Sequence, residues 1–210
     1  SSYKCKAVGV PGTVRGLALA HSQYGKLEWK RLVTPAAELA ERGFLVNEWL
    51  AYSTNGILGD QGVVKGNRYA ELRRVYGRAD GRAWAVGDTM MLPDLAKTLQ
   101  TIAEEGADAF YQGKIADQLV AQMQHGNGLI TKEDLASYQA KLREPTRGTY
   151  REYELFGPPP PSSGGTCVIE ALNMLEPFKL REHPRFSSRN MHLITEAMRR
   201  AFCDRARYLA

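Results

Sequence analysis

Residues 158–166 read Pro-Pro-Pro-Pro-Ser-Ser-Gly-Gly-Thr, and they join a strand pattern to a helix pattern through an unusual turn. The segment before them predicts a short strand because aromatic and large apolar side chains gather there, at Tyr150, Tyr153, Leu155 and Phe156. The segment after them predicts a helix because apolar side chains recur at helical spacing, at Val168, Leu172 and Leu175. Four prolines fix φ and remove four N–H donors, so the turn cannot be the interior of a helix or of a central strand.

The end of this turn has two possible uses. Ser162 and Ser163 offer oxygens that can cap the following helix, and Gly164 and Gly165 allow close approach of another backbone segment. Such a turn presents free N–H groups, which could bind an anion or simply pack against another part of the protein. We favour packing, because helix caps are common in proteins.

Amphipathic patterns predict helices along most of the chain. Pro35 predicts a break or a fresh helix start, with Thr34 as its cap. Asn47 is expected to cap one helix, and Thr131 another, with an acidic residue at the third helical position. The expected helical ranges are 13–23, 27–42, 47–52, 69–75, 93–103, 115–123, a short helix after 131, one that ends at 175, and 188–209. In the last helix the expected buried side chains are Met191, Ile194, Thr195, Met198, Phe202 and Leu209.

The pattern changes between residues 142 and 156. Arg147-Gly148 is a turn signal between two short segments, which predicts a strand pair near 142–156. With many helices and very few strands, the chain is expected to be α+β and predominantly helical.

Composition narrows the function classes. The chain has 210 residues, 43% of them hydrophobic, and a formal net charge of +5, which is ordinary for a soluble globular protein. The basic residues are dispersed and interleaved with acidic ones, so we expect no nucleic-acid binding. No stretch approaches the roughly 20 apolar residues that span a bilayer.

The cysteines and histidines show no metal-binding pattern. Cys5, Cys167 and Cys203 form no paired spacing, and the four histidines are scattered. We therefore expect no metal site and no cofactor, and we expect Cys167 and Cys203 to be buried free thiols on apolar helices.

Six segments in the same order resemble the γ-glutamyltranspeptidase family, also called glutathione hydrolases. The first is Val10-Pro11-Gly12-Thr13-Val14, and the fifth is the proline-rich turn at 158–166. The others span residues 35–44, 106–113, 128–138 and 196–209. The resemblance runs nearly end to end and is weakest around 55–87 and 178–190.

The resemblance implies a fold and a mechanism. Members of the family cut a single precursor into a large and a small subunit, and the new N-terminal Thr of the small subunit is the nucleophile. In that family the whole protein is a four-layer αββα sandwich of the N-terminal-nucleophile hydrolase type, and this chain is expected to be a fragment of such a sandwich. This chain resembles an interior segment of the large subunit, residues 1–210, without a separate second domain, and by itself it is expected to be inactive.

An N-terminal Thr is reactive because its own α-amino group acts as the general base for its hydroxyl. Internal residues such as Thr13, Thr131 and Thr166 lack that amine, and each lies near a predicted helix start. No catalytic, substrate-binding or metal residue is therefore assigned within residues 1–210. The expected partners are the rest of the large subunit, the small catalytic subunit and γ-glutamyl substrates such as glutathione.

The resemblance favours one function and leaves two alternatives. The intact protein is expected to be an autoprocessing γ-glutamyltransferase or glutathione hydrolase, located in the periplasm or outside the cell. One alternative is a related acylase of the β-lactam type or a capsule transpeptidase. The other is a non-catalytic helical scaffold derived from such a subunit.

Overall fold

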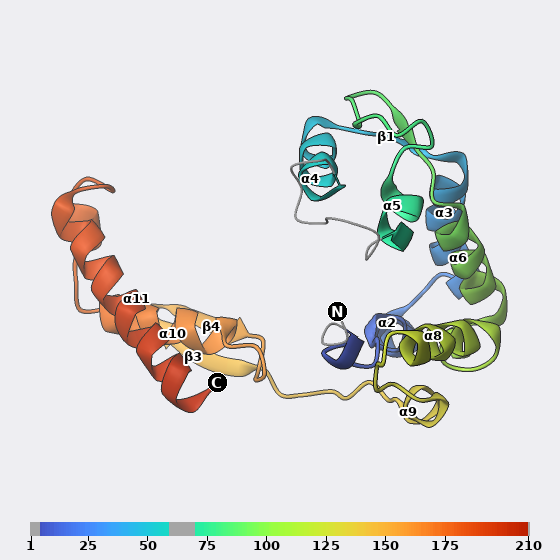
Figure 1. The fold of residues 1–210 in the computed structure, drawn as a ribbon. Helices are drawn as coiled ribbons and strands as arrows, with labels where there is room; N and C mark the ends of the chain where they lie inside the picture. Colours follow the sequence, from blue (N-terminus) through green and yellow to red (C-terminus); the bar gives the residue numbers. More distant parts are fainter. Residues whose placement is uncertain (1–4, 59–69, 210) are drawn as a thin grey trace. The chain divides into compact units, whose positions relative to one another are not determined.

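A computed structural model describes residues 5–58 and 70–209 (Figure 1). The chain divides into two compact units, Ser1–Ala140 and Lys141–Ala210, which we call the N-unit and the C-unit. The expectation of one segment without a separate second domain stays a prediction.

The described part of the N-unit is mostly helical. Its elements are α2 (Thr13–Tyr24), α3 (Trp29–Arg42), β1 (Phe44–Leu45), α4 (Glu48–Leu58), α5 (Ala70–Tyr76), β2 (Thr89–Met90), α6 (Pro93–Glu105), α7 (Asp108–Tyr111), α8 (Lys114–His125) and α9 (Lys132–Ser137). Across both units, no described helix is long and apolar enough to cross a membrane.

Helices α3 and α6 pack against each other through small side chains. Ala37 and Ala40 of α3 are buried, as is Ala103 of α6. The indole N–H of Trp29 donates to the carbonyl of Ile102 over 2.9 Å and joins the start of α3 to the end of α6.

Helix α3 runs unbroken through Pro35, so the predicted break at this proline was wrong. The hydroxyl of Thr34, expected to cap a new helix, instead donates to the carbonyl of Lys30 over 2.7 Å. A proline inside a helix removes one backbone hydrogen bond, and packing against α6 stabilises α3 across that position.

The other two predicted helix caps in this unit are confirmed. The side-chain oxygen of Asn47 accepts a 2.8 Å hydrogen bond from the N–H of Leu50, although α4 continues well beyond the predicted end at 52. Thr131 and Asp134 form a capping box at the start of α9. Helix α5 matches the predicted helix at 69–75, of which residue 69 lies outside the described residues.

Two apolar clusters hold the N-unit together. The first lies around α7, α8 and α9 and contains Tyr111, Ala116, Val120, Ile130 and Leu135. The second contains Val46, Ala51 and Met90, with Trp84 and Leu92 packed against it. It lies beside the antiparallel pair of β1 and β2, in which Phe44 faces Met90.

The C-unit is a β-hairpin with helices. Its elements are β3 (Thr146–Tyr150), β4 (Tyr153–Gly157), α10 (Gly164–Leu175), the 3-10 helix η2 (Leu180–Glu182) and α11 (Ser188–Tyr208). The strand pair is present, but its turn lies at Arg151-Glu152, because Tyr150 faces Tyr153. The predicted turn at Arg147-Gly148 was wrong.

Gly148 lies inside β3 for a packing reason. A Cβ atom at Gly148 would lie 2.3 Å from Cγ2 of Ile169 on α10, so only glycine lets the helix pack this closely on the strand. The glycine that looked like a turn signal is thus a contact between β3 and α10.

The last helix was predicted with the right bounds but with the wrong buried face. Within the C-unit its buried residues are Asn190, Ala197 and Ala201, whereas Met198 and Phe202 are half exposed. Cys203 is exposed, so its prediction as a buried thiol was wrong, and Cys167 is buried as predicted.

Candidate functional site

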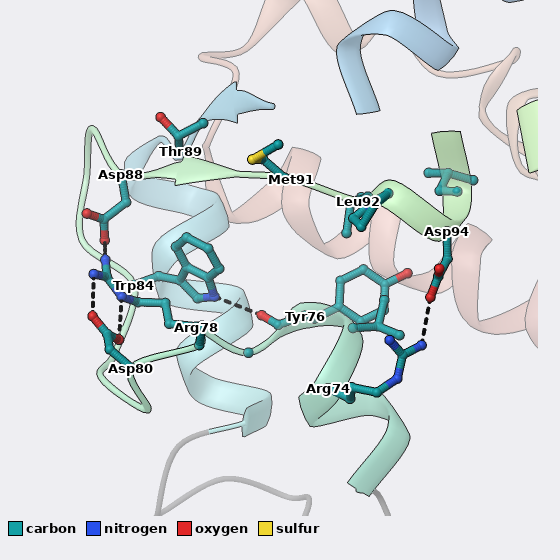
Figure 2. A pocket seen from close by; sticks show the side chains of 15 residues that line it. Arg74, Tyr76, Arg78, Asp80, Trp84, Asp88, Thr89, Met91, Leu92 and Asp94 are labelled. Atoms are coloured by element: carbon teal, nitrogen blue, oxygen red, sulfur yellow. Dashed lines mark hydrogen bonds and ion pairs between the residues drawn. The ribbon is translucent and has the colours of Figure 1, made fainter. Parts of the chain in front are cut away.

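A cleft of about 500 Å³ opens in the N-unit, between the segment that follows α5 and the segment that joins β2 to α6 (Figure 2). An ion pair stands at each end, Arg78 with Asp80 and Arg74 with Asp94 (Figure 2). Aromatic rings and aliphatic side chains line the space between, at Tyr76, Trp84, Met91 and Leu92.

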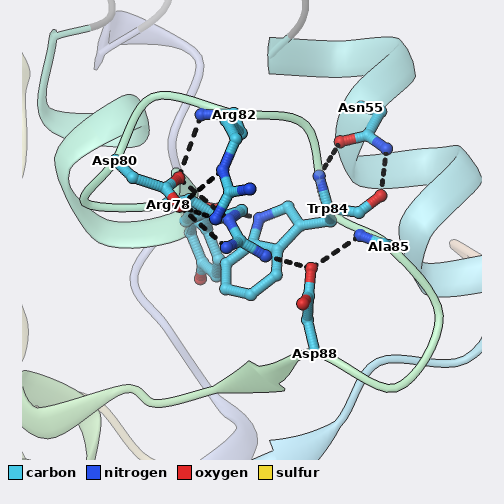
Figure 3. Close-up of polar contacts among 8 residues, drawn as sticks. Asn55, Arg78, Asp80, Arg82, Trp84, Ala85 and Asp88 are labelled. Atoms are coloured by element: carbon cyan, nitrogen blue, oxygen red, sulfur yellow. Dashed lines mark hydrogen bonds and ion pairs between the residues drawn. The ribbon is translucent and has the colours of Figure 1, made fainter.

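At the first end, Asp80 holds two arginines. Arg78 donates to both carboxylate oxygens of Asp80, through Nε at 2.9 Å and Nη2 at 2.8 Å. Arg82 donates to the same carboxylate through its Nε at 2.9 Å and its backbone N–H at 3.0 Å (Figure 3). These donors, the guanidinium of Arg78 above all, hold the pKa of Asp80 far below its usual range.

Asp88 completes this cluster from the segment just before β2. Its carboxylate accepts from Nη1 of Arg78 and, over 2.7 Å, from the backbone N–H of Ala85. The Arg78 guanidinium is the main cause of the lowered pKa of Asp88, and the Ala85 N–H adds to it. All three nitrogens of the Arg78 guanidinium are therefore occupied by carboxylates.

Trp84 is fixed between two helices. Its carbonyl accepts from Nδ2 of Asn55 on α4, and its N–H donates to Oδ1 of the same residue, both over 2.8 Å (Figure 3). Its indole N–H donates to the carbonyl of Tyr76 at the end of α5, again over 2.8 Å. These bonds preorganise one wall of the cleft before any ligand arrives.

At the second end, Arg74 joins α5 to α6. It donates to Glu71 through Nε at 2.9 Å and Nη2 at 2.7 Å, and Nη2 also lies 2.8 Å from Oδ2 of Asp94. The side chains of Arg74 and Asp94 are 58% and 60% exposed, so this pair is open to solvent. Hydrogen bonding to Arg74 lowers the pKa of both carboxylates.

The proline-rich turn in the C-unit is held by packing contacts. A Cβ atom at Gly157 would lie 2.4 Å from Cα of Gly165, so the end of β4 touches the start of α10. The Ser163 hydroxyl accepts from Nε of Arg205 on α11 over 2.8 Å and makes no capping bond. Nη1 of Arg143 donates to the carbonyl of Pro160 over 3.1 Å. These contacts support the packing interpretation of the turn.

Sequence reasoning assigned no site residue, and it passed over the cleft. The cleft falls in and just after residues 55–87, where the motifs are weakest. The available signal was the density of arginine and aspartate around Trp84, between residues 73 and 94. Throughout residues 5–58 and 70–209, no group of three His, Cys, Asp or Glu side chains is placed to hold a metal ion.

Comparison with known proteins identifies the family. The family model described as gamma-glutamyltranspeptidase matches residues 1–210. The chain belongs to this family. The resemblance of its six sequence segments is thereby confirmed, from one end of the chain to the other.

Curated relatives of the gamma-glutamyltranspeptidase family are much longer than this chain. A glutathione hydrolase proenzyme from Escherichia coli (strain K12) is 41% identical over 203 residues, which cover 97% of this chain and 34% of the relative. An acylase ACY 1 proenzyme from Pseudomonas sp. (strain SE83) is 39% identical over 206 residues, which cover 96% of this chain and 35% of the relative. The chain thus spans about a third of the length of these relatives.

Solved structures of the family share the fold. The gamma-glutamyltranspeptidase of Helicobacter pylori matches with a TM-score of 0.89 and 37% identity, over 98% of this chain and 58% of that one. The Bacillus anthracis transpeptidase CapD matches with a TM-score of 0.81 and 30% identity, over 96% of this chain and 67% of that one. The predicted fold class, a helix-rich α+β part of an N-terminal-nucleophile hydrolase, is confirmed.

Proposed function

We propose that the intact protein is a γ-glutamyltransferase or glutathione hydrolase and that this chain is an interior part of its large subunit. The observation that carries the proposal is the family match over residues 1–210, together with 41% identity to a protein named glutathione hydrolase proenzyme. That relative is about three times as long as the matched segment, which supports a larger enzyme with further segments.

In the proposed reaction, an N-terminal Thr of the small subunit attacks the carbonyl carbon of a γ-glutamyl amide. Its α-amino group takes the hydroxyl proton and delivers it to the leaving amine as the C–N bond breaks. Water or the amine of an acceptor then attacks the acyl-enzyme and releases the γ-glutamyl group. Backbone N–H groups stabilise the oxyanion in both steps.

This chain supplies scaffold in that proposal. Two of the described internal threonines are engaged locally: Thr131 caps α9, and Thr34 bonds back within α3. We assign no catalytic residue to residues 1–210, and we expect the chain alone to be inactive. We also propose that the intact protein is exported, as the family resemblance implies.

The experiment is an assay of the full-length precursor with γ-glutamyl-p-nitroanilide. We expect self-cleavage into two subunits on a denaturing gel, followed by release of p-nitroaniline. Replacement of the small subunit's N-terminal Thr by Ala should abolish both. Thr131→Ala is the matched control, because it removes an internal threonine and should leave turnover intact. Turnover that survives loss of the N-terminal Thr, or turnover by residues 1–210 alone, would contradict the proposal.

A second candidate is an acylase of the same family. The observations that favour it are the 39% identity to acylase ACY 1 and a structural match to the cephalosporin acylase of Bacillus halodurans, with a TM-score of 0.83 and 31% identity. The same assay with a glutaryl amide of a β-lactam nucleus in place of the γ-glutamyl amide separates the two. Faster turnover of the glutaryl amide would select the acylase.

A further inference from the structure

We propose that the cleft between α5 and α6 in the N-unit binds a small zwitterion with an aromatic side chain, that is, an aromatic α-amino acid. This inference does not rest on the proposed function, because the cleft residues belong to no catalytic step described above. It rests on the size of the cleft, on the partners of its charged groups and on the apolar side chains that line it, Tyr76, Trp84, Met91 and Leu92.

The size and the rigidity of the cleft suit a small molecule. A volume of about 500 Å³ lies within the range of roughly 300–1,000 Å³ that is typical of ligand sites. One wall is held by the bonds of Trp84 to Asn55 and Tyr76, and the other belongs to the start of α6. A preorganised site does not have to order its own side chains on binding, which favours affinity.

The Arg74–Asp94 pair offers both charges side by side. Arg74 uses Nε and Nη2 for Glu71 and Asp94, which leaves Nη1 without a partner in the described part of the chain. Oδ2 of Asp94 accepts the hydrogen bond from Arg74, whereas Oδ1 of Asp94 accepts from no described residue. A ligand carboxylate can therefore bind Nη1 of Arg74, while the ligand ammonium binds Oδ1 of Asp94.

The space beside this pair is apolar. Figure 2 shows the ring of Tyr76 next to Arg74 and Asp94, with Trp84 beyond it and Met91 and Leu92 along the opposite segment. The indole N–H of Trp84 is already satisfied by the carbonyl of Tyr76, so its ring offers mainly an apolar surface. Aromatic rings favour other aromatic rings at such positions in offset or edge-to-face geometry.

The charge balance of the lining argues against the simpler ligands. Three carboxylates line the cleft, those of Asp80, Asp88 and Asp94, but only two guanidinium groups, those of Arg74 and Arg78. All three nitrogens of the Arg78 guanidinium already donate to carboxylates. A polyanion would meet net negative charge, and a plain cation would leave the open Nη1 of Arg74 unused. An aromatic amino acid pairs its carboxylate with Arg74 and its ammonium group with Asp94, and its ring packs against the apolar side chains of the cleft.

Binding of L-phenylalanine to the intact protein, measured by isothermal titration calorimetry, tests the proposal. Phenethylamine lacks the carboxylate, phenylpropionate lacks the ammonium group, and L-alanine lacks the ring. We expect saturable binding of phenylalanine and binding at least roughly tenfold weaker for each analogue, the loss typical of one charge-assisted hydrogen bond or one buried ring.

Variants place the binding in the cleft. Arg74→Gln and Asp94→Asn should each weaken phenylalanine binding roughly tenfold or more. Arg199→Gln is the matched control, because it removes an exposed arginine with the same 2.8 Å ion pair, to Glu196 on α11. A melting curve for each variant checks that it is folded. If Arg74→Gln does not fold, Asp94→Asn tests the proposal.

Three results would overturn the proposal. The first is the absence of saturable phenylalanine binding. The second is binding that both cleft variants retain, since it would then belong to another part of the enzyme. The third is equal affinity for phenylalanine and phenethylamine, which would leave Arg74 without a role. None of these bears on whether the N-terminal Thr is the nucleophile, so the two proposals can fail separately.

Discussion

Asn55 and Trp84 exchange two hydrogen bonds of 2.8 Å each, although 29 positions separate them in the sequence. One amide side chain on α4 thus satisfies both backbone groups of Trp84. Because Trp84 also donates its indole N–H to the end of α5, the segment between α5 and β2 is fixed to two helices at one residue.

Replacing Asn55 should therefore destabilise the N-unit. Asn55→Ala leaves the N–H and the carbonyl of Trp84 without partners, which typically costs about 1–3 kcal/mol when the groups are partly buried. The midpoint of urea unfolding of the intact protein measures this loss. Asn173→Ala, at an exposed position on α10, is the control and should change the midpoint little. Equal midpoints for the two variants would show that the Asn55 bonds contribute nothing.

The contact between Gly157 and Gly165 predicts a strong effect of one methyl group. In Gly165→Ala, the new Cβ would lie 2.7 Å from the carbonyl oxygen of Pro158, and backbone cannot move aside cheaply. We expect a loss of stability of about 1–3 kcal/mol, as for other overpacked sites. Gly16→Ala on α2 is the opposite case, since apart from the adjacent backbone of its own helix no atom would lie within 4 Å of the new Cβ, and alanine favours a helix. Thermal unfolding should rank Gly16→Ala above the parent and Gly165→Ala below it; the reverse order would contradict the contact.

The capping box of α9 gives a third prediction. Thr131→Ala removes the oxygen that accepts from the N–H of Asp134, and loss of such a cap costs about 0.5–2 kcal/mol. Thr131→Ser keeps the hydroxyl and should keep most of the stability. Hydrogen exchange of the amide of Asp134 reports on the cap directly, and it should speed up in Thr131→Ala only.

A fourth prediction concerns pH. Burial, and then a hydrogen bond with Asp204 on α11, raise the pKa of Glu170 above its ordinary value of 4.5. A raised pKa means that the folded state keeps this proton after the unfolded state has lost it. The contribution of Glu170 to the stability of the protein is therefore fully present below pH 4.5, and it is lost as pH rises through the pKa of the folded state.

Glu170→Gln should remove that fall. Between about pH 4 and pH 7, the urea midpoint of the parent should decline relative to that of Glu170→Gln. Glu152→Gln, in the exposed turn between β3 and β4, is the control and should follow the parent. Parallel curves for the parent and Glu170→Gln would mean that the pKa of Glu170 is not raised in the folded state.

Local signals in the sequence predicted the local features of the fold. The caps at Asn47 and Thr131 were predictable because each depends on residues three positions apart. The break at Pro35 was wrong because packing between α3 and α6 outweighs the local cost of a proline. On α11 the pattern selected Met198 and Phe202, whereas the face that packs in the C-unit carries Ala197 and Ala201.

The cleft was not predictable because the contacts that bring its two sides together join residues distant in the sequence. Asn55 contacts Trp84 across 29 positions of sequence. Arg74, near the end of α5, contacts Asp94, near the start of α6, across 20 positions. Arginines and aspartates at these spacings look the same as a solvated surface until the chain is folded.

The touching glycines at residues 157 and 165 also decide how the C-unit can vary. Because main-chain atoms of β4 and α10 meet at these two positions, any side chain larger than hydrogen there would push the start of the helix away from the strand. Exposed positions on α10, such as Val168, should tolerate substitution better than these two glycines.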